Sequence, residues 1–266
     1  MTRIIADPLF ATADADAFTD RHLTALITGT LAAIRVPNFL TTNGCSAALA
    51  AADALPQNDY DPERVPTRIA RFGPALNDYR QADNTLDADR YWASAETARR
   101  TWTAAKLRPD PVAIALARLG AAWGQALAPA TIGGRAVFGG TLREINNGAL
   151  IHYDEVAREF PGGIFDQQIV AQLAFNLWIA APEHGGETTV WRRRWQPADE
   201  NLRDAYGYLP PVTYGAQQIS LMPHTGDALI FNPTNFHAVA ANPCQRRVAF
   251  AFFLALTSTG QLIYWS

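Results

Sequence analysis

The sequence predicts an α+β fold in which helices of the N-terminal half support a cupin-like jelly roll in the C-terminal half. Between residues 14 and 127, apolar side chains recur mainly at steps of three and four, which is the helical period. From residue 133 onward, short apolar runs alternate with turns rich in Gly, Pro and Asn. Many short strands at near-regular spacing favour a double-sheet jelly roll, whose interior can enclose a ligand.

Length and composition are those of one globular domain. A chain of 266 residues can bury a large core, so we expect a single domain over residues 1–266. Residues 1–130 would be mainly helical support, and residues 131–266 would form the jelly-roll core with the functional site. The net charge of −3 and a pI near 5.9 give no indication of a nucleic-acid surface.

Compartment and partners are inferred from what the sequence lacks. The two cysteines, Cys45 and Cys244, provide neither a disulfide framework nor zinc-ligand spacing. No apolar run reaches the roughly 18 residues of a membrane helix, and the N-terminus has no signal-peptide core. We therefore expect a soluble, cytoplasmic protein with a small-molecule substrate. A homodimer is compatible with the sequence.

The N-terminal half contains four predicted helices. Pro37 blocks continuation of the first helix and makes residues 36–40 extended, and Thr41 or Thr42 can cap the second. Asp110 is a good N-cap because Pro111 follows at the first helical position. Residues 56–89 are expected to be loop with short elements, at the rim of a pocket. The predicted helices span residues 14–35, 41–55, 87–107 and 110–127.

The C-terminal half is predicted to be a succession of strands. Residues 146–148 form a turn, and residues 262–265 are an apolar tail that docks on the barrel or caps its pocket. The run from 169 to 181 is long and apolar without helix caps, which indicates a buried strand. The predicted strands span residues 135–138, 141–145, 169–181, 187–192, 217–222, 227–232 and 246–256.

A candidate metal site begins at the end of one of these segments. His152 and Asp154 stand two residues apart, so an extended backbone places both side chains on one face. His237 lies in a second strand-like segment 85 residues further on. Two histidines and one carboxylate can bind one face of Fe(II) and leave about three positions open for oxygen chemistry. The alternative is a surface loop with two unrelated polar residues.

The order of motifs around these residues resembles the iron(II)/2-oxoglutarate-dependent oxygenase superfamily, roughly from Val137 to Leu256. This resemblance implies a double-stranded β-helix that uses Fe(II), 2-oxoglutarate and O2, with His152, Asp154 and His237 as metal ligands and catalytic centre. The motifs are His152-x-Asp154, Gly185-Gly186-Glu187-Thr188, Pro223-x-x-Gly226-x-Ala228-Leu229-Ile230-Phe231, His237-Ala238-Val239 and Arg246-Arg247-Val248-Ala249-Phe250.

The size of the chain and its last strand also resemble the small oxygenases and halogenases that act on free amino acids. Halogenases of this group carry Gly or Ala in place of the carboxylate ligand, whereas Asp154 is present here. The resemblance therefore implies oxidation of an unactivated C–H bond in a free amino acid or an amino-acid-derived natural-product intermediate, by hydroxylation in the first place. Desaturation or oxidative ring closure, such as cyclopropanation, would use the same residues.

The resemblance places a basic 2-oxoglutarate anchor about ten residues after the second histidine, so Arg246 and Arg247 are both candidates. An arginine suits a carboxylate because its guanidinium can donate two parallel hydrogen bonds. Alternation favours Arg247, since small residues share its face and leave room for a ligand, whereas bulky ones share the face of Arg246. The first set is Ala249, Ala251, Phe253 and Ala255, and the second is Val248, Phe250, Phe252 and Leu254.

Other polar residues could contact the cofactor or the substrate. Asn176 and Trp178 share one face of the long strand, and the amide could bind a cofactor oxygen. Glu155 could contact a substrate ammonium group or be a solvated loop charge. Arg143 and Glu144 precede the metal motif, and alternation directs only one of them inward.

Two other classes of function remain open. A cupin-like barrel with zinc or manganese could catalyse hydrolysis or isomerisation with the same three ligands. A jelly-roll binding module with a degenerate site would need no complete triad. The zinc or manganese enzyme gives no role to a buried arginine ten residues after His237, and of the three classes only the oxygenase forms succinate.

Overall fold

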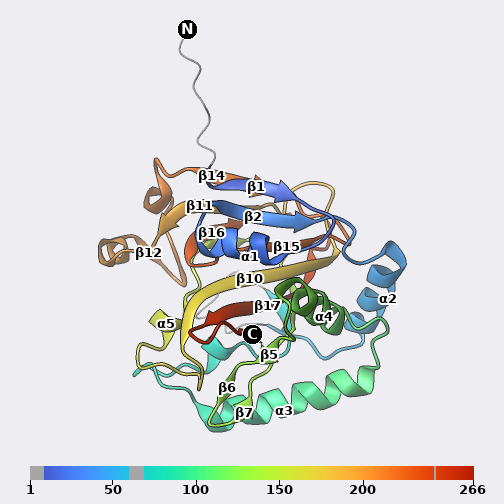
Figure 1. The fold of residues 1–266 in the computed structure, drawn as a ribbon. Helices are drawn as coiled ribbons and strands as arrows, with labels where there is room; N and C mark the ends of the chain where they lie inside the picture. The colour runs from blue at the N-terminus through green and yellow to red at the C-terminus, as the bar shows by residue number, and fades with distance from the viewer. Residues whose placement is uncertain (1–8, 60–68, 243) are drawn as a thin grey trace.

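Two β-sheets form the body of the protein in the computed structural model, which describes residues 9–59, 69–242 and 244–266 (Figure 1). The larger sheet has ten strands, with β18 (Leu262–Trp265) and β5 (Ala128–Pro129) attached beside β17. Its main order is β1 (Ala11–Asp14), β2 (Leu31–Val36), β15 (Ala228–Phe231), β10 (Ile169–Ala180), β17 (Val248–Thr257), β8 (Thr141–Glu144), β4 (Ala70–Phe72) and β3 (Asn58–Asp59).

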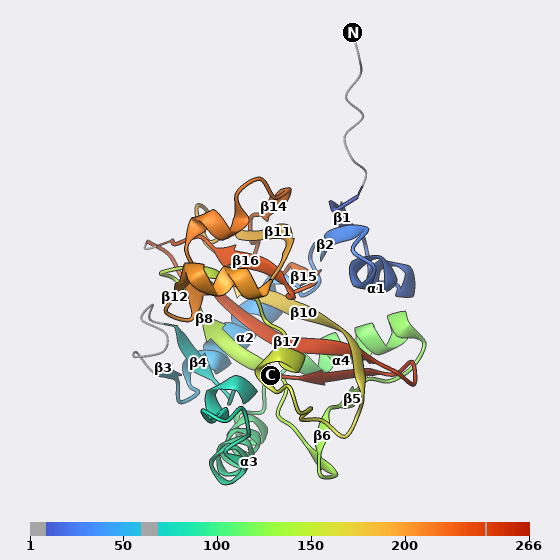
Figure 2. The same cartoon turned by 90° about the vertical axis from the view of Figure 1, so that its left-hand side faces the viewer.

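The smaller sheet has six strands and lies against the inner face of the larger one (Figure 2). Apolar residues from both sheets, including Ala33, Trp178 and Val190, pack in one cluster between them. A separate hairpin joins β6 (Thr131–Ile132) to β7 (Arg135–Ala136). The smaller sheet has the order β12 (Arg203–Asp204), β13 (Gly207–Tyr208), β9 (Ala149–His152), β16 (Asn235–Val239), β11 (Thr188–Arg194) and β14 (Gln218–Leu221).

Helices cover the outer face of the larger sheet. The four long ones are α1 (Asp20–Ile27), α2 (Thr42–Asp53), α3 (Ala88–Ala105) and α4 (Pro111–Trp123). Their buried residues form one core with the outward-facing side chains of β10 and β17, among them Phe175 and Phe250. Short helical turns complete the fold: η1 (Leu76–Tyr79), α5 (Val156–Glu159), η2 (Pro197–Leu202) and η3 (Pro210–Thr213).

The predicted helix over residues 14–35 is wrong in its second half. Helix α1 ends at Ile27, and Gly29 then takes a left-handed conformation with φ 77°, which glycine adopts without steric cost. The chain returns as strand β2, which lies between β1 and β15 in the larger sheet. Its side chains are buried on both faces, so the apolar pattern alone does not distinguish it from a helix.

The other predicted helices are confirmed with shifted ends. Thr41, Asp87 and Asp110 cap α2, α3 and α4 by accepting backbone N–H bonds. Residues 1–130 are less exclusively helical than expected, because β1 to β5 all join the larger sheet. Part of the predicted loop, residues 60–68, lies outside the described residues, as does the N-terminal segment 1–8.

The C-terminal tail docks on the sheet as expected, because β18 pairs antiparallel with β17. The Ser266 hydroxyl then accepts N–H bonds from Gly140 and Thr141 at the start of β8. Within the described ranges, no helix combines the length and apolar character that crossing a bilayer requires.

Candidate active site

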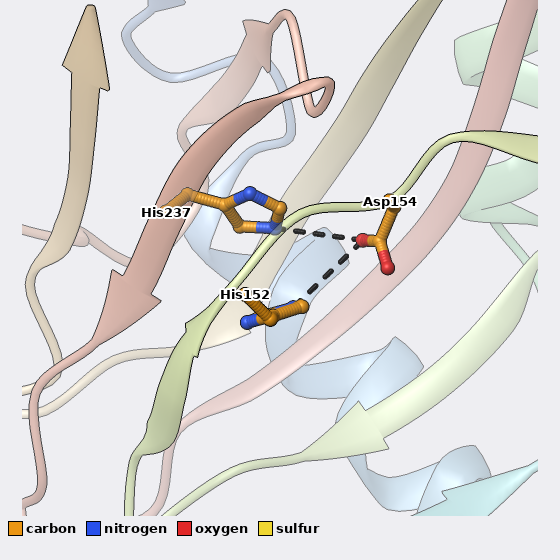
Figure 3. A group of neighbouring side chains, drawn as sticks. All are labelled: His152, Asp154 and His237. Atoms are coloured by element: carbon orange, nitrogen blue, oxygen red, sulfur yellow. Dashed lines mark ion pairs between the residues drawn. The ribbon is translucent and has the colours of Figure 1, made fainter. Parts of the chain in front are cut away.

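Two neighbouring strands of the smaller sheet bring the predicted metal ligands together (Figure 3). His152 ends β9 and is the direct register partner of His237 in β16. Asp154 lies two residues beyond His152, where its backbone N–H donates to the Pro233 carbonyl at 2.9 Å. The two imidazoles and the carboxylate therefore converge from adjacent backbones.

The ligand atoms have the spacing of a metal site. Asp154 Oδ2 lies 3.4 Å from His237 Nε2 and 3.8 Å from His152 Nε2. One donor atom from each residue fits within 4.8 Å of the others. Two donors about 2.1 Å from an octahedral ion stand about 3 Å apart, so a small contraction would complete the coordination.

Hydrogen bonds select the tautomer of both imidazoles. His152 Nδ1 lies 2.7 Å from the Leu150 carbonyl, and His237 Nδ1 lies 3.0 Å from the Asn235 carbonyl. A carbonyl oxygen only accepts, so each Nδ1 carries a proton, and the neutral imidazole then has its lone pair on Nε2. Both Nε2 atoms face Asp154, which is the state that metal binding needs.

Burial and neighbouring charges shift the pKa values of His152 and Asp154 toward their metal-binding protonation states. Burial and the nearby His237 lower the pKa of His152 to about 4, so its imidazole is neutral at pH 7. Burial raises the pKa of Asp154, but His152, His237 and Arg143 more than offset this effect and lower it overall. A carboxylate beside imidazole nitrogen donors suits a divalent transition metal.

Gln172 on β10 holds the loop that carries Asp154. Its side-chain oxygen accepts from Val156 N–H at 3.0 Å, and its amide donates to the Asp154 carbonyl at 3.3 Å. This bridge joins the larger sheet to the metal-binding segment. The position of Gln172 in the sequence gives no indication of this bridge.

The triad opens into a cavity of about 700 Å³ between the two sheets. The cavity wall near the triad includes Ala174, Phe231, Val239 and Ala251. Its charged and hydrogen-bonding side chains, besides the triad, include Arg80, Arg143, Arg158, Asn176, Thr188, Glu200, Arg203, Tyr206, Tyr208 and Arg247. A volume of this order accommodates a drug-sized organic molecule.

Arg247 lies in this cavity as a buried cation. It is only 3% exposed, and it donates to the Gly186 carbonyl at 2.9 Å and to Thr188 Oγ1 at 3.1 Å. Burial lowers its pKa to about 10, and no carboxylate of the described residues forms an ion pair with it. A buried charge of this kind needs an anionic ligand.

Arg246 points to the other side of the sheet. It forms ion pairs with Glu144 at 2.7 Å and with Asp53 of α2 at 2.9 Å. Its neighbours Val248 and Phe250 pack in the helix-side core, as alternation predicts. Arg246 is thus absent from the cavity wall, and the expectation that it is an alternative anchor is not met by this geometry.

Asn176 and Trp178 have different positions although they share one face of β10. Asn176 lines the cavity, and no hydrogen bond to its side chain is found within the described residues. Trp178 is fully buried beneath Arg247, whose guanidinium carbon lies 5.7 Å from the ring centroid. Trp178 can therefore support the arginine but does not reach the cavity, contrary to its prediction as a cofactor-binding residue.

The three residues predicted to contact the substrate also have different positions. Arg143 lines the cavity, whereas Glu144 faces outward to Arg246. This resolves which of the two points inward. Glu155 is not part of the cavity wall, but it forms an ion pair at 2.6 Å with Arg158, which is. Its contact with a substrate ammonium group stays a prediction.

The segment from η2 to β13 supplies cavity residues that we did not single out from the sequence. They are Glu200, Arg203, Tyr206 and Tyr208. Tyr206 accepts the Leu150 N–H at 2.7 Å and places its ring 5.7 Å from that of His152. The Tyr-Gly-Tyr pattern predicts a turn at most, and only the fold brings it beside β9.

Comparison with known proteins agrees with this geometry, although no protein-family profile matches the chain. The chain is 51% identical over 258 residues, 97% of this chain and 96% of the relative, to the L-gamma-glutamyl-L-propargylglycine hydroxylase of Streptantibioticus cattleyicolor. The crystal structure of an N-substituted L-amino acid dioxygenase from Burkholderia ambifaria shares its fold. The two structures superpose with a TM-score of 0.64 and 17% sequence identity, over 93% of this chain and 92% of the Burkholderia protein.

A 2-His-1-carboxylate triad within two facing sheets is the metal site of non-haem iron dioxygenases with a jelly-roll fold. The chain belongs to the iron(II)/2-oxoglutarate-dependent oxygenases, in the family of the Streptantibioticus hydroxylase.

Proposed function

We propose that this dioxygenase hydroxylates a γ-glutamyl-linked amino acid with a short apolar side chain. The observation that carries the proposal is the combination, in one cavity, of the triad and a buried Arg247 that forms no ion pair with any described residue. The relative that is 51% identical over almost the whole chain is a hydroxylase of a γ-glutamyl dipeptide, which supports this substrate class.

Each part of the cavity has a proposed role. Nε2 of His152 and His237 and the carboxylate of Asp154 would hold Fe(II). Arg247 and the Thr188 hydroxyl would bind the far carboxylate of 2-oxoglutarate, because a guanidinium can donate two parallel bonds to it. Asn176, whose amide faces the cavity, would contact a cofactor oxygen.

When bound, iron with 2-oxoglutarate and O2 supplies the oxidation of a C–H bond, and the protein supplies placement. Apolar side chains around the triad, such as Phe231 and Val239, restrict water near the reacting carbon. Arg143 lines the cavity close enough to lower the pKa of both His152 and Asp154. It is therefore placed to attract a substrate carboxylate toward the metal.

The proposal is tested by turnover with Fe(II), 2-oxoglutarate and O2. We expect γ-glutamyl-L-propargylglycine to gain one oxygen atom with one succinate formed per product, and free L-propargylglycine to react more slowly. A product lighter by two hydrogens would identify desaturation or ring closure instead. Absence of both product and succinate with either substrate would overturn the proposal.

The cytoplasmic location, the single-domain organisation and a homodimer remain proposals that rest on the sequence alone. A zinc or manganese hydrolase would use the triad but not Arg247, and a binding module would need neither. Succinate formation separates the oxygenase from both.

A further inference from the structure

Glu200 and Arg203 form a charged pair on the cavity wall. They lie on the segment that leads into β12, the edge strand of the smaller sheet (Figure 2). Glu200 lies in η2 and Arg203 in β12. Arg203 Nη1 is 3.9 Å from Glu200 Oε1, which is too long for a direct hydrogen bond. Both residues line the cavity, and the side chains of Glu200 and Arg203 are 49% and 43% exposed.

Tyr208 bridges the two charges and fixes their orientation. Its hydroxyl donates to Glu200 Oε1 at 2.6 Å and accepts from Arg203 Nη1 at 2.6 Å. Trp195 Nε1 also donates to Glu200 Oε1, at 2.7 Å. Arg203 Nε donates to the Ala205 carbonyl at 3.1 Å.

These bonds leave one atom of each charge available. Glu200 Oε2 and Arg203 Nη2 have no partner among the described residues. A carboxylate oxygen and a guanidinium N–H side by side match an ammonium and a carboxylate on one carbon atom. This is the α-amino acid head that a γ-glutamyl group presents.

The pair is also fixed relative to the metal ligands. Tyr208 is the register partner of Ile151, next to His152 on β9. Tyr206, between Arg203 and Tyr208, holds the Leu150 N–H of the same strand. A head group bound here is therefore held at a set distance from the triad by one strand, which would determine which carbon of the acceptor amino acid approaches the metal.

We propose that Glu200 and Arg203 are the specificity residues that recognise the α-ammonium and α-carboxylate of the γ-glutamyl group. Glu200 Oε2 accepts from the ammonium and Arg203 Nη2 donates to the carboxylate, while Tyr208 is a positioning residue. This inference rests on the proposed function, and it distinguishes a γ-glutamyl dipeptide from other N-acyl amino acids.

The test compares three acyl groups on L-propargylglycine: γ-glutamyl, glutaryl without the ammonium, and 4-aminobutanoyl without the α-carboxylate. The wild type should prefer γ-glutamyl by about 10- to 100-fold in kcat/KM, mainly through KM. Glu200→Gln should lose most of the preference for γ-glutamyl over glutaryl and keep the preference over 4-aminobutanoyl. Arg203→Met should lose most of the preference for γ-glutamyl over 4-aminobutanoyl and keep the preference over glutaryl.

Two surface variants on α3, Glu96→Gln and Arg100→Met, are matched controls and should keep both preferences. The charge-transfer band of the anaerobic Fe(II)–2-oxoglutarate complex should persist in all four variants, which reports an intact metal site. Unchanged preferences in Glu200→Gln and Arg203→Met, or an equal loss with all three substrates, would overturn the inference. Failure of the wild type to bind or turn over the γ-glutamyl dipeptide would overturn the proposed function and this inference with it.

Discussion

Arg247 shows how function and stability can oppose each other at one residue. The lowering of its pKa from 12.5 to about 10 by burial corresponds to a cost on the order of 3 kcal/mol for the charged side chain in the unliganded protein. A bound carboxylate would offset that cost. The same burial would strengthen the interaction with 2-oxoglutarate, because water screens it little.

Arg247→Met should separate these two effects. We expect its affinity for 2-oxoglutarate to fall at least about 30-fold, since a buried hydrogen-bonded charge contributes about 2–5 kcal/mol. The free energy of unfolding without ligand should stay equal or rise, because an uncompensated charge is removed. Calorimetric titration and thermal unfolding with and without 2-oxoglutarate measure both quantities.

Arg246→Met is the matched control at the neighbouring position. It should bind 2-oxoglutarate normally but lose up to about 1 kcal/mol of stability with the partly exposed ion pairs. The opposite outcome, with weakened binding in Arg246→Met and normal binding in Arg247→Met, would contradict the assignment of the anchor.

At the scale of the elements, the ion pairs of Arg246 with Asp53 and Glu144 join α2 and β8 to the residues just before β17. Although burial raises the pKa of Glu144, the hydrogen bonds from Arg246 and Asn146 lower it overall. A carboxyl with a lowered folded pKa stabilises the protein above its unfolded pKa, near 4.5, and loses this effect as pH falls through the folded value.

Glu144→Gln should therefore be less stable than the wild type at pH 7, by about 1 kcal/mol or less. The difference should shrink as pH falls below about 4.5. Denaturant unfolding at several pH values measures it, with the exposed Glu96→Gln as control. A difference that grows toward low pH would have the wrong sign for this ion pair.

The turn between β8 and β9 delivers His152 to the site and depends on Gly148. Its φ is 80°, and a Cβ there would lie 2.6 Å from the Val239 carbonyl of β16. Gly148→Ala should destabilise the protein by about 1–3 kcal/mol through backbone strain and displace β9 from β16. It should therefore also weaken Fe(II) binding.

Gly162→Ala is the matched control for this turn, because a Cβ at Gly162 meets no atom within 4 Å. It should change neither unfolding nor metal affinity. Normal stability and metal affinity in Gly148→Ala would show that the approach of β9 to β16 tolerates displacement.

At the scale of the whole molecule, the sequence predicts those features that depend on residues close together in the chain. The triad spacing, the caps of α2 and α4, and the inward position of Arg247 all follow from alternation, capping chemistry and motif order. The strand at residues 31–36 could not be predicted, because burial on both faces removes the alternation that distinguishes a half-buried strand from a helix.

The residues proposed to bind the γ-glutamyl group could not be predicted from the sequence, for a different reason. Glu200, Arg203 and Tyr208 become a unit only through hydrogen bonds with one another and through the pairing of β13 with β9. Gln172 likewise acts across two sheets. Such contacts depend on the tertiary fold and have no local signature in the chain.

The central claim is that one cavity binds Fe(II) through the triad and 2-oxoglutarate through Arg247. The most direct measurement is the visible metal-to-ligand charge-transfer band of the anaerobic protein with Fe(II) and 2-oxoglutarate. We predict a band in the wild type, none in His152→Ala, and a band in Arg247→Met only at much higher 2-oxoglutarate concentration. A wild type without the band, or one whose band is unchanged in both variants, would contradict the account.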